Sequence, residues 1–173
     1  MRADATITAL LRGDRHEFRS GPDLVVQVLR LCWVSDAFLA QVLYRLKASL
    51  QSKRIPILPR VAHKLAMIAA QVSIGDPVII QPGMYILHGQ VVIDGLIEIG
   101  SGAVIAPWVT IGLRAGNVQG ATIEDDVKIG TGAKVIGPVR IGAGATIGAN
   151  SVVVSDVAGG ATAAGVPARE RAS

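Results

Sequence analysis

The sequence is poor in the residues that usually anchor a large protein core. Aromatic residues make up only 3% of the chain, although half of its residues are hydrophobic. A core must therefore be built from aliphatic side chains and alanine. Cys32 is the only cysteine, which excludes an intrachain disulfide and leads us to expect a reducing compartment.

Long apolar runs are also absent. No uninterrupted apolar stretch approaches the ~18 residues that a membrane-spanning helix needs. The first residues become charged too early for a secretory signal peptide. The 173 residues contain too much apolar surface and too little charge for a disordered polymer. We therefore expect a soluble cytoplasmic protein without a membrane span.

Charge and glycine are distributed unevenly along the chain. Residues 1–71 hold 11 of the 17 Lys and Arg, whereas residues 72–173 hold 18 of the 20 Gly. Aromatic residues are not interleaved with the basic ones, so we expect a solvated helix face and no nucleic-acid partner. The composition predicts an α-helical region over 1–71, a repeat domain over 72–158 and a C-terminal tail over 159–173.

The first part shows the spacing of amphipathic helices. Apolar residues recur three and four positions apart in residues 23–34, 36–50 and 60–71. Asp23 and Ser35 are the expected N-caps, because short side-chain oxygens accept hydrogen bonds from the free amides of a first turn.

A six-residue repeat organises the second part. One extra residue intervenes near His88, and the aliphatic residues in phase are Ile74, Ile80, Ile86, Ile93, Ile99, Ile105, Ile111, Ile123, Ile129, Val135, Ile141, Ile147 and Val153. Four positions further on stand the small residues Ala103, Val109, Val127, Ala133, Val139, Ala145 and Ser151. A period of six predicts a coil with three flat sides, each a short parallel strand, with both sets pointing inward. A glycine-rich sandwich would instead show a period of two and hairpin turns.

Glycine and a break in the repeat mark special positions. We expect corners with positive φ where glycine directly follows the aliphatic residue, at Gly75, Gly100, Gly112, Gly130, Gly142 and Gly148. The repeat fails once, where Asn117 occupies an aliphatic position. Residues Leu113–Thr122 are therefore expected to leave the prism as a loop, and loops on rigid scaffolds often carry sites.

Several motifs resemble those of the hexapeptide-repeat acyltransferases, and most closely those of the serine acetyltransferases. They are Leu43–Leu46, Val72–Gly75, Ile86–Gly89, Ile129–Lys134, Ile141–Val152 and Ala163–Arg169. The resemblance implies a mainly β fold, a left-handed parallel β-helix preceded by an α-helical segment. It also implies acetyl-CoA as the acyl donor, and a homotrimer or a dimer of trimers with sites between subunits.

The resemblance implies an acetyl-CoA-dependent O-acetyltransferase acting on L-serine or a similar small polar acceptor, as in cysteine biosynthesis. Two other functions stay open, which are O- or N-acetylation of a sugar or polysaccharide and a non-catalytic solenoid that binds partners. Residues 116–117 and 121–123 look more like those of relatives that acetylate sugars. No metal is expected, because only one histidine lies in the repeat and carbonic anhydrases of this fold need several.

His88 is the candidate catalytic base. A hydroxyl is a poor nucleophile at neutral pH, and histidine is well suited to accept its proton during attack on a thioester. His88 is the only histidine in the repeat, and it matches the catalytic-histidine motif of the family. The family pairs this histidine with an Asp where this chain has Ser73, so a backbone carbonyl or Asp94 is expected to orient the ring.

The resemblance assigns the remaining candidates to two ligands. The expected acetyl-CoA contacts are Gly112, whose amide would stabilise the oxyanion, and Thr131, Lys134, Ala149 and Arg169. The expected acceptor contacts are Ser73, Asp94, Arg114 and Asn117. Residues 118–120 replace an Arg-His pair of the family. The family's C-terminal extension that docks a sulfhydrylase has no counterpart, so that complex is not expected.

Overall fold

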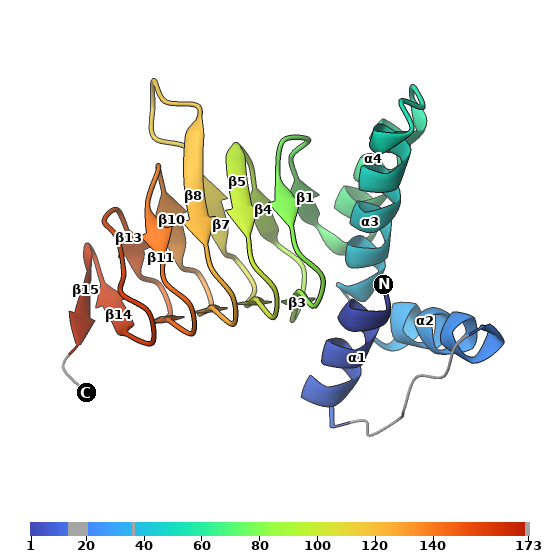
Figure 1. Ribbon diagram of the computed structural model, residues 1–173, viewed down its shortest axis with the longest axis horizontal. Coiled ribbons are helices and arrows are strands. Elements are labelled where there is room, and N and C mark those ends of the chain that lie inside the picture. Colours follow the sequence, from blue (N-terminus) through green and yellow to red (C-terminus); the bar gives the residue numbers. More distant parts are fainter. Residues whose placement is uncertain (14–20, 36, 172–173) are drawn as a thin grey trace.

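Helices precede a three-sided β-solenoid in the computed structural model, which describes residues 1–13, 21–35 and 37–171 (Figure 1). The helices are α1 (Arg2–Leu11), α2 (Pro22–Val34), α3 (Phe38–Ser52) and α4 (Leu58–Ala70). Three of them confirm the predicted helical segments. Helix α1 was not predicted, because the residues that it buries are small or polar: Asp4, Ala5, Thr8 and Ala9. No helix in the described part of the chain is long and apolar enough to cross a bilayer.

The predicted N-caps were wrong. Helix α2 starts after Gly21 and helix α3 after Ala37, and neither N-cap makes a side-chain hydrogen bond. Pro22 fixes the start of α2 one residue before Asp23, since its φ already suits a first helical turn. Asp23 therefore lies in the first turn, where its charge favours the helix dipole. Ser35 is the C-cap of α2.

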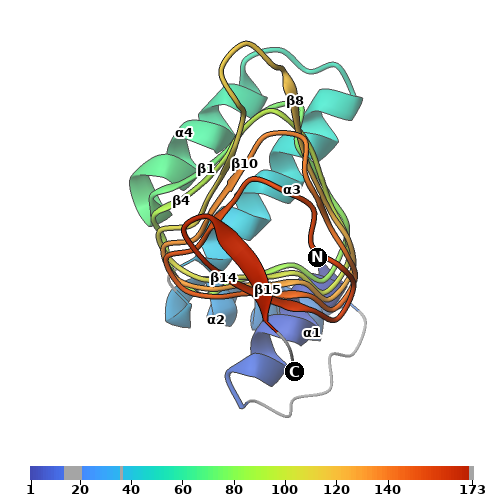
Figure 2. The ribbon, with the colours of Figure 1, turned by 90° about the vertical axis from the view of Figure 1, so that its left-hand side faces the viewer.

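Short strands form the three faces of the solenoid, and along its axis they outline a triangle (Figure 2). The first face holds β1 (Val72–Ile74), β4 (Val91–Ile93), β7 (Thr110–Gly112), β10 (Lys134–Ile136) and β13 (Val152–Val153). The second holds β2 (Ile79–Ile80), β5 (Leu96–Ile99), β8 (Gln119–Ile123) and β11 (Arg140–Ile141). The third holds β3 (Tyr85–Ile86), β6 (Val104–Ile105), β9 (Lys128–Ile129), β12 (Thr146–Ile147), β14 (Thr162–Gly165) and β15 (Ala168–Arg171).

The interior of the prism is the stack that the repeat predicts. Every in-phase aliphatic residue from Ile74 to Val153 is buried, and so are the small residues from Ala103 to Ser151. Both sets belong to one continuous core, apart from the polar Ser151. Aliphatic stacking along the axis therefore replaces the aromatic anchors that the chain lacks.

The predicted role of the glycines after the aliphatic residues was wrong. None of these six glycines has a positive φ. Most of them lie instead where the next coil passes closely. A Cβ added to Gly142 would come within 2.4 Å of the Gly159 amide nitrogen, and one on Gly100 within 2.7 Å of the Asp125 nitrogen. The positive φ values occur two residues later, for example at Gly102, Gly132 and Gly144.

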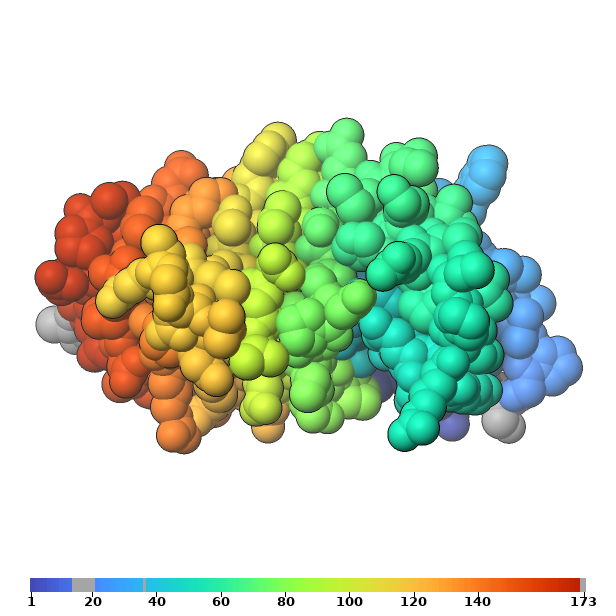
Figure 3. Space-filling view, turned by 90° about the horizontal axis from the view of Figure 1, so that it is seen from above, coloured from blue at the N-terminus to red at the C-terminus, as the bar shows by residue number. Residues whose placement is uncertain are grey.

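The loop and the tail differ in extent from their predicted bounds. Residues 113–118 leave the prism, whereas Gln119 already begins β8 and pairs with Leu96. Figure 3 shows this loop, in yellow-orange, as a raised bulge on the solenoid surface. In the segment predicted as a tail, β14 pairs with β12 and β15 folds back on β14. Most of that segment is therefore part of the solenoid.

Helix α3 closes the end of the solenoid where the first coil would expose unpaired backbone groups. Lys47 Nζ donates to the Ile74 carbonyl on the first face at 2.6 Å. Tyr44 Oη donates to the Val78 carbonyl and accepts from the Ile80 amide, both at 3.0 Å, on the second face. On the third face Gln41, with its amide oriented to match its neighbours, donates to the Met84 carbonyl and accepts from the Ile86 amide, both at 3.0 Å. One helix thus satisfies edge groups of all three faces.

A second contact joins helix α1 to the same end. The buried Asp4 carboxylate accepts from Arg45 Nε and Nη2 at 3.0 and 2.9 Å and from the Gly83 amide at 3.0 Å. Arg45 also donates to the Ile80 and Gln81 carbonyls.

Beside α1, Cys32 is half-buried next to a small cluster around Phe38, and burial raises the pKa of its thiol.

Candidate active site

The corners between the third and first faces form one continuous edge of the prism. Ile86 pairs with Ile105, Ile105 with Ile129, and Ile129 with Ile147. The residues two positions after these isoleucines therefore occupy equivalent corners of four successive coils: His88, Pro107, Thr131 and Ala149. We call this line the His88 edge. It brings together the predicted base and two of the predicted acetyl-CoA contacts.

His88 is exposed and lies in a depression at the helical end of this edge. The depression has a volume of about 480 Å³, and its lining residues are Ile68, Ala69, Ala70, Gln71, His88, Gly89, Gln90, Pro107 and Trp108. The end of α4 forms one wall and two consecutive coils form the other. The imidazole is therefore open to solvent at a site with room for a small molecule.

The backbone that carries His88 is held on both sides. Leu87 N donates to the Ile105 carbonyl at 3.0 Å, and Gln41 holds Met84 and Ile86 on the opposite side. Strand β3 would otherwise be an exposed edge strand, because β6 is its sole neighbour in the described sheet. A packed helix thus fixes the backbone two residues before the imidazole.

Lys134 lies beside the same edge. Its Nζ donates to the Trp108 carbonyl at 2.6 Å and to Thr110 Oγ1 at 3.1 Å. The residue was predicted to meet a phosphate of acetyl-CoA. In this structure its ammonium group donates to the coil that carries Trp108 and Thr110, and the phosphate contact stays a prediction.

Three residues around the depression have left-handed backbone conformations. They are Gln71, Gln90 and Trp108, with φ values of 53°, 58° and 59°. Gln90 Nε2 also donates to Gln71 Oε1 at 2.5 Å, which places two amide side chains beside His88. Such conformations are uncommon for residues other than Gly, Asn and Asp, and they concentrate at functional sites.

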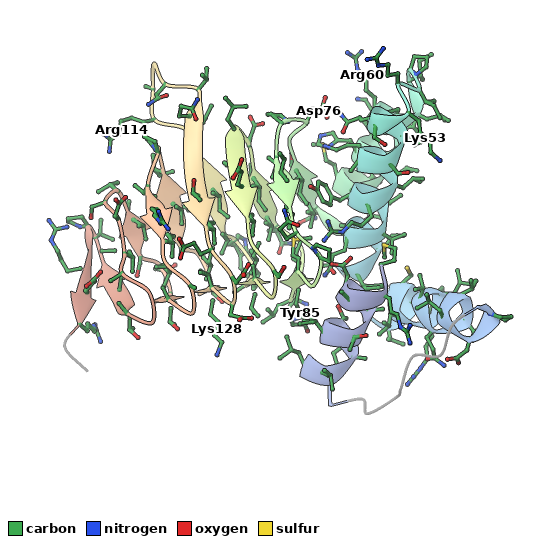
Figure 4. The ribbon with its side chains drawn as sticks, in the orientation of Figure 1. Lys53, Arg60, Asp76, Tyr85, Arg114 and Lys128 are labelled. Carbon is green, nitrogen blue, oxygen red and sulfur yellow. The ribbon has the colours of Figure 1, made fainter. Side chains whose placement is uncertain are left out.

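The predicted acceptor contacts lie away from the His88 depression. Ser73 is half-buried at the centre of β1, and its neighbour in the sheet is Val92. Asp94 follows β4, whereas His88 precedes it, and a three-residue strand spans about 10 Å. The two side chains line different depressions. Arg114 projects from the loop that follows β7, where the chain leaves the first face (Figure 4).

Other predicted residues lie where the chain turns from the first face to the second, a line of corners that we call the second edge. Gly112 ends β7, and its carbonyl accepts from the Gly137 amide at 2.9 Å. Asn117 folds back within the loop, where its Oδ1 accepts from the Gln119 amide at 2.8 Å. Within one chain, these residues and His88 thus occupy edges on opposite sides of the first face.

The second edge has a charged depression of its own near α4, of about 550 Å³, lined by Arg60, His63, Lys64, Met67, Gly75, Asp76, Pro77 and Asp94. Figure 4 shows Asp76 and Arg60 on this side of the molecule. The Lys47 ammonium donates to Asp76 at 3.2 Å and lowers the pKa of that carboxyl, against the raising effect of burial.

The remaining acetyl-CoA candidates lie further along the solenoid. The Thr131 carbonyl accepts from the Asn150 amide at 2.8 Å, so Thr131 and Ala149 are neighbours across two coils. Arg169 lies on β15 and is exposed, with Nη1 donating to the Ala168 carbonyl at 3.1 Å.

Sequence reasoning missed Trp108, the two glutamines and Gln41. Trp108 follows an in-phase isoleucine by three residues, which is a position that glycine, asparagine or aspartate takes in other coils. That mismatch was visible in the repeat. Gln41 gives no such signal, because its partners lie more than forty residues away in the chain.

The family described as bacterial transferase hexapeptide (six repeats) matches residues 120–155. A serine acetyltransferase of Helicobacter pylori J99 is 37% identical over 134 residues, which cover 75% of this chain and 78% of the relative. The serine acetyltransferase of Synechococcus elongatus is 35% identical over 143 residues, covering 80% of this chain and 57% of that relative.

The chain belongs to the serine acetyltransferase family.

Solved structures of this family share the whole architecture. A serine acetyltransferase in complex with CoA superposes with a TM-score of 0.80 at 29% identity, over 98% of this chain and 67% of the other. The Neisseria gonorrhoeae enzyme in complex with serine gives a TM-score of 0.78 at 28% identity, over 96% and 66%. The helices and the solenoid of this chain are therefore those of serine acetyltransferases.

The Synechococcus relative is longer than its region that aligns with this chain. The chain spans little more than half of the Synechococcus relative. The described residues contain no cluster of three His, Cys, Asp or Glu side chains that could hold a metal ion.

Proposed function

We propose that this member of the serine acetyltransferase family transfers an acetyl group from acetyl-CoA to the hydroxyl of a small polar acceptor. L-serine is the first acceptor to test, because the relatives are named serine acetyltransferases. One observation supports the proposal most strongly. His88 is exposed at the head of an edge that continues through the acetyl-CoA candidates Thr131 and Ala149.

The chemistry follows from the imidazole. His88 would accept the proton of the acceptor hydroxyl as its oxygen attacks the thioester carbonyl. The new C–O bond forms, the C–S bond breaks, and the proton passes from the imidazolium to the departing thiolate. The products are an acetyl ester and free CoA. A backbone amide near the carbonyl would stabilise the developing oxyanion; the candidate is Gly112 of a neighbouring copy, since within one chain Gly112 and His88 lie on opposite edges of the first face.

We further propose that a second copy of the chain completes the site, as in a homotrimer. Arg114 and Asn117 lie on the opposite edge from His88, with the first face between them. A neighbouring copy could bring its loop edge to the His88 edge of the first. In this arrangement the acceptor would bind between subunits.

Thiol release from acetyl-CoA tests the proposed activity, with serine, homoserine and a panel of sugars as acceptors. His88→Gln should lower kcat/KM by about 10²–10⁴-fold while the protein stays folded. Lys128→Gln is the control, since Lys128 is exposed on β9 of the third face, away from both edges. Near-normal turnover by His88→Gln would remove His88 as the base. Absence of thiol release with every acceptor would favour a non-catalytic solenoid.

A further inference from the structure

The part of the His88 depression that one chain builds lacks partners for the charges of free serine. Serine carries a carboxylate and an ammonium group, and binding sites usually match such charges with charged partners. None of the described residues that line this depression is Asp, Glu, Lys or Arg. If serine binds here, its charged partners therefore come from a neighbouring copy, whose second edge would adjoin His88.

The charged depression on the second edge lies level with His88 along the solenoid. Strand β4 connects the two sites, because His88 lies three residues before it and Asp94 directly follows it. Helix α4 also reaches both sites, since its first turns, from Arg60 to Met67, line the charged depression and its last residues line the other. A three-fold axis parallel to the solenoid keeps every group at its own height. Such an axis would place the charged depression of one copy opposite His88 of the next.

Helix α4 supplies the cations of the charged depression. Arg60 and Lys64 lie four residues apart on this helix, are exposed, and line the depression together. Like charges at this spacing destabilise a helix slightly, and so does a cation in the first turn, where Arg60 lies. Within the described part of the chain, neither side chain forms a hydrogen bond or an ion pair. Both charges are thus available to an anion.

Asp94 supplies the opposite charge in the same depression. A Cβ added to Gly75 would lie 2.2 Å from Asp94 Oδ1, so this carboxylate folds over the neighbouring coil. Asp76 also lines the depression, but it already accepts from the Lys47 ammonium at 3.2 Å. Asp94 has no such partner among the residues that the structure describes. The depression therefore combines an unmatched carboxylate with two unmatched cations.

We infer that Arg60 and Lys64 of a neighbouring copy bind the carboxylate of serine, and that Asp94 of that copy binds its ammonium group. Charge-assisted hydrogen bonds of this kind are short and strong. The serine hydroxyl would then point to His88 of the first copy. The Arg114 loop lies one coil further along the same edge. This inference rests on the proposed acetyl transfer and the shared site, and it names the residues that select the acceptor.

Acceptors that lack one charge of serine test the inference in the full chain. L-serinamide lacks the carboxylate, and 3-hydroxypropanoate lacks the ammonium group. We expect the parent to favour serine over each analogue about 10–100-fold in kcat/KM. The double variant Arg60→Gln, Lys64→Gln should lose the preference over serinamide, and Asp94→Asn the preference over 3-hydroxypropanoate. The KM for acetyl-CoA should stay unchanged in both variants.

Lys53→Gln is the matched control. It removes a positive charge from the same helical region, and Lys53 is exposed at the end of α3 without lining the charged depression. Both preferences should keep the parent's values in this variant. Co-refolding His88→Gln with the double variant should restore serine turnover, because some interfaces then combine two native edges.

The outcomes separate this inference from the proposed function. Serine turnover by the parent with unchanged preferences in the variants would overturn the inference and leave the transferase intact. If Arg114→Ala loses the preference over serinamide while the double variant keeps it, the loop holds the carboxylate and the inference is wrong. If the double variant dissociates by light scattering, its two cations are subunit contacts and the inference is refuted. No thiol release with any acceptor would overturn the proposed function and the inference together.

Discussion

The buried ammonium group of Lys47 lies 2.6 Å from the carbonyl oxygen of Ile74, and 3.0 Å from that of Gly75. Lysine is seldom buried without a partner. Here it binds carbonyl groups that would otherwise form the open edge of the first coil. The side chain is 2% exposed. The helical region is thus joined to the solenoid by hydrogen bonds as well as by apolar packing.

Replacing Lys47 should therefore destabilise the fold. Lys47→Met keeps the length of the side chain but leaves the Ile74 and Gly75 carbonyls without their donor. We expect the free energy of unfolding to fall by about 1–3 kcal/mol, as measured by urea denaturation. Lys128→Met, on an exposed strand position of the third face, is the control and should change it little. Equal midpoints for the two variants would contradict the capping role.

Asp4 should make stability depend on acidic pH. Burial by itself raises the pKa of this carboxyl, but the hydrogen bonds and charge of Arg45, the charged terminal amine and the Gly83 amide lower it overall from its usual 3.8. A group with a lowered folded-state pKa contributes stability above its unfolded value and loses it as the pH falls through the folded value. We therefore expect the free energy of unfolding to decline below about pH 4.

Variants can assign that decline. Asp4→Asn should lower stability at neutral pH and flatten the acidic part of the profile, because the carboxylate no longer titrates. Glu98→Gln, at an exposed position of β5, should keep the parent's profile. If Asp4→Asn lowers the free energy of unfolding by the same amount at every pH, the charge of the carboxylate does not contribute to stability.

Gly142 lies where two coils approach closely, so adding a single methyl group at this residue should destabilise the fold. An added Cβ would lie 2.4 Å from the Gly159 nitrogen and 2.7 Å from its Cα, and backbone cannot move as easily as a side chain. We expect Gly142→Ala to cost about 1–3 kcal/mol in thermal or urea unfolding. Gly112→Ala is the matched control, because its nearest contact would be Thr110 Cγ2 at 3.8 Å. Equal stability of the two variants would show that the coils separate readily.

Mixing experiments can test whether the site is shared between copies. His88→Gln should be inactive through its own edge and Arg114→Ala impaired through the opposite one. If neighbouring copies combine these edges, co-refolded mixtures should recover activity that neither variant has alone, because some interfaces then contain both native residues. Thiol release is the readout. Activity equal to the average of the separate variants would place the whole site within one chain.

The solenoid itself was predictable because its repeat is local. Each aliphatic residue has the same environment as those six positions away, so the phase of Ile99, Ile105 and Ile111 fixes which way they point. The break at Asn117 likewise marked the loop. The residue at which this loop ends could not be predicted, since Gln119 joins β8 through pairing with Leu96 in another coil.

The site was only partly predictable. His88 could be singled out as the one histidine of the repeat. Its surroundings could not, since the end of α4 lines its depression and Gln41 holds the strand before it, both from outside the repeat. The predicted partner Asp94 lines another depression, because the intervening strand β4 carries the chain across a whole face. The number of residues between them carries no measure of that separation.

The sequence by itself determined the three-sided coil, its aliphatic interior and the position of the exposed histidine. These features depend on a short period that repeats the same steric and hydrophobic choice in every coil. Tertiary structure alone decided how α3 closes the first coil and which residues surround His88. It also placed the loop of Arg114 on the opposite edge. Those relationships join segments far apart in the chain, and local pattern carries no information about such distances.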